Sequence, residues 1–477
     1  MGKINDGHRF SLLFGCCIIF SLLLAACGQN GTSGGNGGTG TGNGQGSSTP
    51  GGTGTVTTQT QNTSTSPANP TTPVTTTCPA TGTARAAVLP PLPAGSQASI
   101  VYIINKGGSS NPTSGTLERY DVASGKSLVT ASFPNTYISD AELSSDGDWI
   151  LFVTVADQQA KLQMVRRDGQ YLQTLYCVAT ATNGANGASA LSNVQWSTNE
   201  KLIIFNNYTY SSAGGGNNQV LLLNAQTGSL QSELAMARGG QLYPVVTWLD
   251  NTRAYLRAPS IDAPADSLYL LDTTKGAHQP LSNLTLVFRD QAASNTYPCW
   301  DFDSSYDGQH LYTTQCTLTM STTGPGEGTR VGPSKLSMQP TTGGTATMLY
   351  NNASVAVTTV RAISSNTLLL LFENQNYTGI SVDTSQNGLW KINTNGSGLT
   401  RLTSNGGGVS AGPSSLCQYS QYPWSNVSRD GSMYSLQQYS ANGSIALEYG
   451  TLSGGNPSTF ASASGGSQLS IVGWTTA

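Results

Sequence analysis

One short unit recurs seven times between residues 97 and 477. It consists of a strand, a polar turn that ends near a glycine, and a second strand. Its copies begin at Leu117, Leu162, Val220, Leu268, Leu336, Leu389 and Leu447. An Asp or Asn that opens a type I turn, followed by a Gly that supplies a positive φ, is typical of a hairpin with a bulge. The recurrence therefore predicts an all-β repeat protein.

A second hairpin precedes six of these units, and its copies begin at Ala141, Val194, Val246, Trp300, Val360 and Trp424. The missing seventh copy is divided between the two ends of the chain, because residues 469–476 match its first strand and residues 99–104 match its second. Four strands per unit and a first unit built from both ends predict a seven-bladed β-propeller over residues 96–477, closed by the C-terminal strand. A six- or eight-bladed ring is the competing prediction.

The first 27 residues have the parts of a bacterial secretion signal. Lys3 and Arg9 form a basic region, and an apolar run covers residues 10–26. This run is long enough for a signal-peptide core and short for a membrane span. The sequence Leu24-Ala25-Ala26-Cys27 is similar to the lipobox of bacterial lipoprotein signal peptides. This resemblance implies a signal peptide over residues 1–26, lipidation of Cys27 and a lipid anchor on the extracytoplasmic side of the cell membrane. An uncleaved membrane anchor is the alternative.

Residues 27–95 consist almost entirely of Gly, Thr, Ser, Asn, Gln and Pro. Such a composition cannot bury enough apolar surface to offset the backbone entropy of folding. We therefore expect a disordered tether between Cys27 and the propeller, flexible in its Gly-rich half and more extended in its Thr- and Pro-rich half.

The turn of the second hairpin carries a further signature. Residues 144–152 read Ser-Ser-Asp-Gly-Asp-Trp-Ile-Leu-Phe, and residues 305–308 and 427–431 repeat part of this pattern. It resembles the repeats of TolB-type, WD-like β-propellers, although Ser145, Tyr306 and Arg429 replace the usual Pro before Asp-Gly. The turn over residues 121–126 also resembles quinoprotein-like propeller repeats, without the Trp that follows it there. These resemblances imply a propeller fold and leave the function open.

Charge and histidine content exclude several classes of function. The chain has 9% charged residues and a net charge of −3, so it lacks the basic footprint of nucleic-acid binding. Its three histidines leave little material for a metal site, and a Ser-His-Asp triad would have to use His278 or His310. Asp301, Asp303 and Asp307 depart from calcium-loop spacing, and Asp307-Gly308 is explained by a hairpin turn. We therefore expect no metal and no cofactor, and assign no catalytic residue.

The predicted turns divide between two ends of the propeller. Turns joining first to second and third to fourth strands are short, whereas the other connections are long, as in residues 206–218, 316–335, 374–388 and 404–422. Insertions confined to one end mark the binding face of a repeat protein, with tolerated drift of surface loops as the alternative. Five tyrosines give these loops amphipathic rings suited to protein or glycan contact: Tyr208, Tyr210, Tyr377, Tyr419 and Tyr422.

Charged side chains are expected near the start of the innermost strands. Asp140, Glu142, Asp301 and Arg361 are predicted to line the mouth of the central channel. They are the best polar-site candidate in so weakly charged a chain. Isolated, solvated charges at the channel mouth are the alternative.

Five cysteines follow Cys27, and an extracytoplasmic location favours their oxidation. Cys299 and Cys316 flank one first-to-second hairpin, so we expect a cross-strand disulfide between them. Cys177 and Cys417 are placed in blade-to-blade connections on the long-loop end, and one of the five cysteines must lack a partner within the chain. Reduced, buried cysteines are the alternative.

These features together predict a monomeric, lipid-anchored propeller that serves as a non-catalytic binding or scaffold module. Its partner would be a protein or a polysaccharide of the cell envelope, and its membrane contact would be the lipid anchor alone. The alternative is an extracellular hydrolase or lyase that uses the carboxylates at the channel mouth.

Overall fold

The computed structural model describes residues 77–80, 92, 95, 97–107, 111–157, 159–179, 189–209, 217–235, 243–259, 265–291, 296–320, 328–376, 381–403, 411–415, 423–440, 444–464 and 466–476. The predicted signal peptide, Cys27 and most of the predicted tether lie outside these residues. No helix among the described residues is long and apolar enough to cross a membrane.

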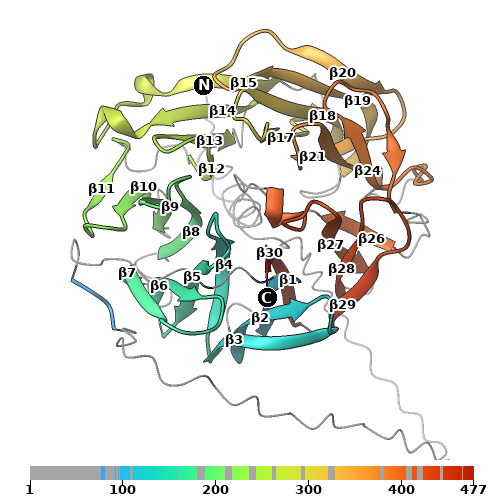
Figure 1. The fold of residues 1–477 in the computed structure, drawn as a ribbon. Coiled ribbons are helices and arrows are strands. Elements are labelled where there is room, and N and C mark those ends of the chain that lie inside the picture. The colour runs from blue at the N-terminus through green and yellow to red at the C-terminus, as the bar shows by residue number, and fades with distance from the viewer. Residues whose placement is uncertain are drawn as a thin grey trace, which may run out of the picture.

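Seven antiparallel sheets surround one axis and form the blades of a closed propeller (Figure 1). The predicted all-β, seven-bladed fold is therefore confirmed. Blade 1 takes its first strand from the end of the chain, and the other blades follow in chain order.

The first four blades have one four-stranded sheet each. Blade 1 comprises β30 (Gln468–Thr476), β1 (Ala98–Lys106), β2 (Ser114–Asp121) and β3 (Lys126–Pro134). Blade 2 comprises β4 (Tyr137–Leu143), β5 (Trp149–Ala156), β6 (Gln159–Arg166) and β7 (Gln173–Ala179). Blade 3 comprises β8 (Ser189–Trp196), β9 (Leu202–Thr209), β10 (Asn217–Asn224) and β11 (Leu230–Ser232). Blade 4 comprises β12 (Val245–Trp248), β13 (Arg253–Pro259), β14 (Ala265–Asp272) and β15 (Thr285–Gln291).

The remaining blades follow the same plan, with two short extra strands beside blade 5. Blade 5 comprises β17 (Trp300–Ser304), β18 (His310–Met320), β19 (Gly328–Pro340) and β20 (Thr347–Asn352), with β16 (Thr296–Tyr297) and β23 (Gln375–Asn376) paired alongside. Blade 6 comprises β21 (Val357–Ala362), β22 (Thr367–Phe372), β24 (Gly388–Asn393) and β25 (Thr400–Arg401). Blade 7 comprises β26 (Ala411–Ser415), β27 (Met433–Ser440), β28 (Ile445–Thr451) and β29 (Ser458–Ala463).

The first and last strands of the propeller, β1 and β30, meet in blade 1. β30 pairs antiparallel with β1, with Ile100 opposite Trp474 and Tyr102 opposite Ile471, and a bulge lies between Val101 and Tyr102. This pairing gives β1 a partner on each side, since β1 also pairs with β2, and it makes β30 the innermost strand of the blade. The division of the seventh hairpin between the two chain ends, predicted from the sequence, is therefore correct.

The hydrophobic core is distributed over the seven junctions between neighbouring blades. Each of the seven buried apolar clusters found among the described residues draws its side chains mainly from two consecutive blades. The junction of blades 7 and 1, for example, buries Leu447 beside Ile100 and Trp474. Because burial of apolar area is the main stabilising term, each blade depends on its two neighbours.

A hydrogen-bonded turn explains the repeated Ser-x-Asp pattern. In blade 2, the hydroxyl of Ser144 donates to Asp146, and it accepts from the backbone N–H of Trp149 at 3.0 Å. The same Ser-to-Asp or Ser-to-Asn bond recurs in the first-to-second turns of blades 3, 5 and 7, at Ser197, Ser305 and Ser428. The pattern that resembles TolB-type repeats is thus the chemistry of one turn, since short polar side chains satisfy the backbone groups that the turn leaves unpaired.

The start of blade 7 differs from the prediction. The sequence places the first strand of this blade at residues 424–427, but a short 3-10 turn, η4 (Pro423–Ser425), lies there, followed by an isolated bridge from Val427 to Tyr434. The strand β26 lies earlier, inside the segment predicted to be a long loop, and pairs with the far half of β27.

Candidate functional site

The turns of the propeller lie at two ends, but their lengths do not divide as strictly as the sequence predicted. Two residues join β5 to β6, a second-to-third connection, whereas twelve join β14 to β15, a third-to-fourth connection. At one end, called here the tight-turn end, lie the first-to-second and third-to-fourth turns, such as those over residues 144–147 and 224–228. At the other, called the long-loop end, lie the second-to-third turns and the connections between blades. Several of the latter segments fall outside the described residues.

The largest regular structure described at the long-loop end is a small sheet above blade 5. The strands β18 and β19 continue past the blade, and Thr317 pairs with Val331 and Thr319 with Thr329. The strand β16 pairs with the outer part of β18, and β23, which belongs to the chain of blade 6, pairs with the outer part of β19. We call β16, the outer halves of β18 and β19, and β23 the accessory sheet.

The accessory sheet corrects one prediction. The sequence assigned residues 316–335 to a long irregular loop, yet most of the described residues in this range are extended and paired. Threonine and valine at alternate positions favour such a hairpin. The Gly-rich residues between the two strands are typical of a loop, and for this reason the sequence predicted one.

Covalent and ionic contacts brace the accessory sheet at its base. Cys299 and Cys316 form a disulfide, and the backbone N–H of Cys316 donates to the carbonyl oxygen of Cys299 at 2.7 Å. Arg330 on β19 lies 3.6 Å from the carboxylate of Glu373, which precedes β23 in blade 6. The accessory sheet is therefore fixed to both blade 5 and blade 6. On β16, the ring of Tyr297 is 46% exposed.

Four of the five tyrosines predicted for the binding loops lie outside the described residues: Tyr210, Tyr377, Tyr419 and Tyr422. Tyr208 lies on β9, opposite Asn218 on β10, and is half-buried. It is thus part of a strand rather than a loop.

Asp140 and Glu142 lie on the innermost strand of blade 2, as predicted, but they do not face an open channel mouth. A carboxylate oxygen of Asp140 accepts a hydrogen bond of 3.0 Å from the backbone N–H of Val194, and Glu142 accepts one of 2.7 Å from that of Trp196. Both acceptors are buried, and both donors lie on β8, the innermost strand of blade 3. These two carboxylates therefore join one blade to the next.

Blades 5 and 6 repeat the arrangement. Asp301 accepts from the backbone N–H of Val360 at 3.0 Å, and Asp303 accepts from that of Ala362 at 2.7 Å. Arg361, the residue between the two donors, forms a buried ion pair of 2.6 Å with Asp301. Alternate residues of a strand share a face, so two acids at i and i+2 match two N–H groups at j and j+2.

Asp140, Glu142, Asp301 and Arg361 are therefore buried and hydrogen-bonded between neighbouring blades. The sequence correctly put these residues on innermost strands, but it could not show that backbone N–H groups of the next blade lie within reach. Asp303, which the sequence considered only as part of a rejected calcium loop, belongs to the same set. Its position two residues after Asp301 is the signal that could have found it.

Burial dominates the titration of these carboxyl groups. It raises the pKa of Asp140 to about 7, although hydrogen bonds from Val194, Ala141 and Asn193 act in the opposite direction. It raises the pKa of Glu142 well above its ordinary value, and the nearby charge of Asp140 adds to this effect. Burial also raises the pKa of Asp303 to about 7, against the opposing charge of Arg361.

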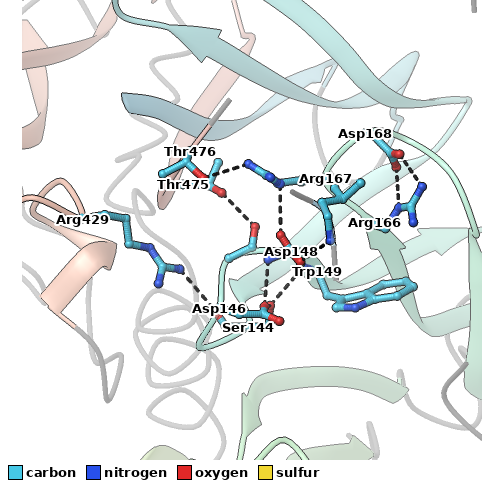
Figure 2. Close-up of polar contacts among 12 residues, drawn as sticks. Ser144, Asp146, Asp148, Trp149, Arg166, Arg167, Asp168, Arg429, Thr475 and Thr476 are labelled. Atoms are coloured by element: carbon cyan, nitrogen blue, oxygen red, sulfur yellow. Dashed lines mark hydrogen bonds and ion pairs between the residues drawn. The ribbon is translucent and has the colours of Figure 1, made fainter. Parts of the chain in front are cut away.

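A second polar network closes the ring at the tight-turn end (Figure 2). Blade 1 has no first-to-second turn, since its first strand ends at Thr476 and its second begins at Ala98. Arg429, from the turn of blade 7, donates to the carbonyl oxygen of Ser145 in the turn of blade 2 at 2.6 Å and to that of Trp474 at 3.3 Å. Its guanidinium also lies 4.1 Å from the ring centroid of Trp424.

The last two residues of β30 also form hydrogen bonds with blade 2. The hydroxyl of Thr475 donates to the carbonyl oxygen of Gly147 at 2.8 Å, and Arg167 donates to the hydroxyl of Thr476 at 3.1 Å (Figure 2). Arg167 is itself paired with the buried carboxylate of Asp148 at 3.2 Å. Gly147 has a φ of +75°, and a Cβ there would lie 2.4 Å from a nitrogen of Arg429, so only glycine admits this packing.

The other side chains considered for chemistry have local roles in the structure. Asp307 accepts from Ser305 and from the backbone N–H of Gln309, which is the turn geometry expected from the sequence. His310 is the first residue of β18 at the tight-turn end. Among the described residues, no three His, Cys, Asp or Glu side chains are grouped so as to hold a metal ion.

Comparison with known proteins adds the following. No protein-family model and no curated protein sequence matches the chain. Solved structures with a similar fold include TolB from Acinetobacter baumannii, with 12% identity over 62% of this chain and 61% of that one and a TM-score of 0.36. An uncharacterized protein from Listeria monocytogenes EGD-e has 15% identity over 64% and 79% of the two chains and a TM-score of 0.40. Oligopeptidase B from Leishmania major has 11% identity over 77% and 49% and a TM-score of 0.45.

This chain thus spans 61% of the first of these proteins and about half of the peptidase. At such identities and TM-scores the likeness carries no argument about activity or partners. The propeller assignment rests on the strand order and on the register of β1 with β30.

Proposed function

We propose that the protein is a lipid-anchored, extracytoplasmic propeller that binds a protein or an envelope polymer through its long-loop end, as a monomer and without catalysis of its own. The observation that carries this proposal is the accessory sheet. It extends beyond blade 5 and is braced by the Cys299–Cys316 disulfide and by the contact of Arg330 with Glu373. A rigid, exposed element on an otherwise regular scaffold is the usual place for a recognition surface.

The hydrolase or lyase alternative depended on the acids of the innermost strands. Asp140, Glu142 and Asp301 each accept a backbone N–H from the neighbouring blade, so using them for proton transfer would break a junction of the ring. This geometry favours the binding function over the enzymatic one.

The lipid anchor can be tested separately from the binding function. Cells that make the full chain are labelled with a clickable fatty acid, and the wild type is compared with Cys27→Ser. We expect label and membrane fractionation for the wild type and loss of both for the variant. Equal labelling of the two proteins would overturn the proposed anchor and leave the binding proposal to its own test.

The binding function is tested by site-specific crosslinking in cells. A photoreactive amino acid replaces Tyr297 on the accessory sheet or, as a matched control, Tyr306 in the first-to-second turn of the same blade. The two tyrosines are 46% and 62% exposed, so a partner can reach a photoreactive side chain at either position. We expect a discrete adduct from position 297 that is absent from position 306. Adducts from position 306 alone, or from neither position, would contradict recognition at the long-loop end.

A further inference from the structure

Two junctions of the propeller are built on the same plan and differ in one central residue. In the first, two acids of β4 accept backbone N–H groups from two alternate residues of β8. In the second, two acids of β17 accept backbone N–H groups from two alternate residues of β21. All four strands are innermost strands of their blades (Figure 1). The residue between the two donors is Gln195 in the first junction and Arg361 in the second.

Arg361 supplies a positive charge to the junction of blades 5 and 6. Its guanidinium lies 2.6 Å from the carboxylate of Asp301 and donates to the carbonyl oxygen of Phe302 at 3.4 Å. Its charge also acts on Asp303, where it opposes the rise in pKa that burial causes. One side-chain cation therefore serves a pair of buried acids, which reduces the high cost of burying their charge.

The junction of blades 2 and 3 has the two acids but no basic residue at the equivalent position. Asp140 and Glu142 are 9% and 5% exposed, and no ion pair among the described residues includes either of them. The charges that act on Glu142 are those of two further acids, Asp140 and Glu200.

Two buried oxygen atoms at this junction have no hydrogen-bond donor. Glu142 uses one carboxylate oxygen to accept the backbone N–H of Trp196, and its other oxygen, Oε1, has no partner among the described residues. The side-chain oxygen of Gln195 has none either. A carboxylate or amide oxygen can only accept, so a buried one without a donor points to a ligand that supplies positive charge.

We propose that the junction of blades 2 and 3 is a Ca²⁺ site, with the carboxylates of Asp140 and Glu142 and the amide oxygen of Gln195 as its side-chain ligands. Carboxylate and amide oxygens are the ligands that Ca²⁺ takes in proteins, with backbone oxygens or water completing the coordination. The bound cation performs at this junction the part that Arg361 performs at the other. With only two carboxylates, its dissociation constant should be about 10⁻⁴–10⁻³ M.

A proton is the occupant that competes with the cation. Without Ca²⁺, burial keeps the pKa of Asp140 at about 7 and that of Glu142 well above its ordinary value. Binding is therefore measured at pH 8, where Asp140 is mostly ionised. The site joins two blades and has no part in the proposed recognition at the long-loop end, so the two proposals succeed or fail separately.

The first experiment follows thermal unfolding of the purified full chain at pH 8. The protein is treated with a chelator, dialysed, and heated with CaCl₂ up to about 10 mM or with NaCl of the same ionic strength. We expect Ca²⁺ alone to raise the melting temperature by about 2–4 °C. Asp140→Asn/Glu142→Gln should lose this response. No rise with Ca²⁺, an equal rise with NaCl, or an unchanged response in the double variant would overturn the proposal.

The second experiment exchanges the central residues of the two junctions, with Ca²⁺ binding measured by calorimetry. Gln195→Arg supplies the positive charge from within the chain, so we expect at least a tenfold loss of Ca²⁺ affinity in a protein that still folds. Gln226→Arg, at an exposed turn residue of the same blade, adds the same charge and should bind Ca²⁺ as the wild type does. Arg361→Gln should gain a second Ca²⁺ equivalent. Undiminished binding by Gln195→Arg would refute the assigned site.

Discussion

The guanidinium of Arg429 donates a 2.6 Å hydrogen bond to the carbonyl oxygen of Ser145, although a whole blade separates the two turns that carry these residues. Blade 1 lies between them and contributes no turn at this position, because both ends of the chain are there. Arg429 therefore links the turns of blades 7 and 2 by a hydrogen bond across the position where blade 1 has no turn. Burial lowers its pKa to about 10, so the side chain remains charged at neutral pH.

We expect Arg429→Met to destabilise the protein by about 1–3 kcal/mol, because the carbonyl groups of Ser145 and Trp474 lose a charged donor. The matched control is Arg166→Met, since Arg166 pairs with Asp168 within a single turn of blade 2 (Figure 2). Removing that surface pair should cost less than about 1 kcal/mol. Urea unfolding followed by tryptophan fluorescence measures both. Similar losses for the two variants would mean that Arg429 is an ordinary surface residue.

Asp301→Asn should be more damaging, with a loss of about 3–5 kcal/mol, because it removes the carboxylate of the buried ion pair with Arg361. Adding Arg361→Met in the same chain should restore part of the loss, since the buried positive charge is then removed as well. Asp250→Asn is the control, because Asp250 and Arg253 form an ion pair with side chains 37% and 36% exposed. A single-variant loss no greater than that of Asp250→Asn would show that the junction tolerates the loss of this ion pair.

The carboxyl of Asp140 predicts a measurable pH dependence. Its pKa rises from 3.8 to about 7 on folding, so the native state binds the proton more tightly than the unfolded state does. The stability that this proton contributes is complete below about pH 4 and is lost as the pH rises towards 7. One pKa unit corresponds to about 1.4 kcal/mol, so the effect amounts to a few kcal/mol.

Other carboxyl groups, such as those of Asp250 and Asp430, have lowered pKa values and act in the opposite direction. The informative quantity is therefore the difference in melting temperature between the wild type and Asp140→Asn. The melting temperature of the wild type should fall relative to that of Asp140→Asn as the pH is raised from 5 to 8. Glu200 remains in both proteins. The charge of Asp140 also raises the pKa of Glu142, and its absence from the variant changes the difference in the same direction. A pH-independent difference would indicate that Asp140 titrates near its ordinary value.

Trp474 should determine how firmly the ring closes. Its side chain is fully buried, and its indole N–H donates to the hydroxyl of Ser435 in blade 7 at 2.9 Å. Trp474→Phe keeps most of the packing and should cost about 1–2 kcal/mol for the lost hydrogen bond. Trp474→Ala should cost about 3–5 kcal/mol and expose the edge of β1 to solvent. Hydrogen exchange of β1 amides tests this directly, and unchanged protection in Trp474→Ala would rule out a role of β30 in protecting β1.

Removal of the Cys78–Cys177 bond by Cys78→Ser/Cys177→Ser should lower the free energy of unfolding by about 2–4 kcal/mol, because the bond closes a long loop in the unfolded chain. Calorimetry without reductant measures this loss. If the variant melts with the wild type, the N-terminal attachment contributes nothing to the stability of the propeller.

The regular part of the fold could be predicted from the sequence because it repeats. The turns that pair Ser with Asp or Asn are encoded within a few residues and recur in four blades. The hairpin unit with Asp or Asn before a Gly recurs seven times in the sequence. The closure by residues 469–476 could be predicted because only six copies of the second hairpin are contiguous in the sequence. The two halves of the seventh copy lie at residues 469–476 and 99–104. The start of blade 7 was misplaced because the η4 turn lies where the strand was expected.

The site could not be predicted in the same way. Asp140 and Asp301 were correctly located on innermost strands, but their partners are backbone N–H groups 54 and 59 residues away, which have no signature of their own. The extension of β18 and β19 could not be predicted because the residues between them have a composition typical of loops. The disulfide between Cys177 and Cys78 could not be predicted either, because Cys78 lies in a segment whose composition indicates no structure.

The pairing of Ala98 with Thr476 has a practical consequence. Because the two ends of the folded chain are neighbours, a short peptide could join them, and the chain could be reopened in a turn of another blade. Such a circular permutant should keep the same seven blades. A reporter domain fused after the last residue would, for the same reason, project from the tight-turn end and leave the accessory sheet accessible.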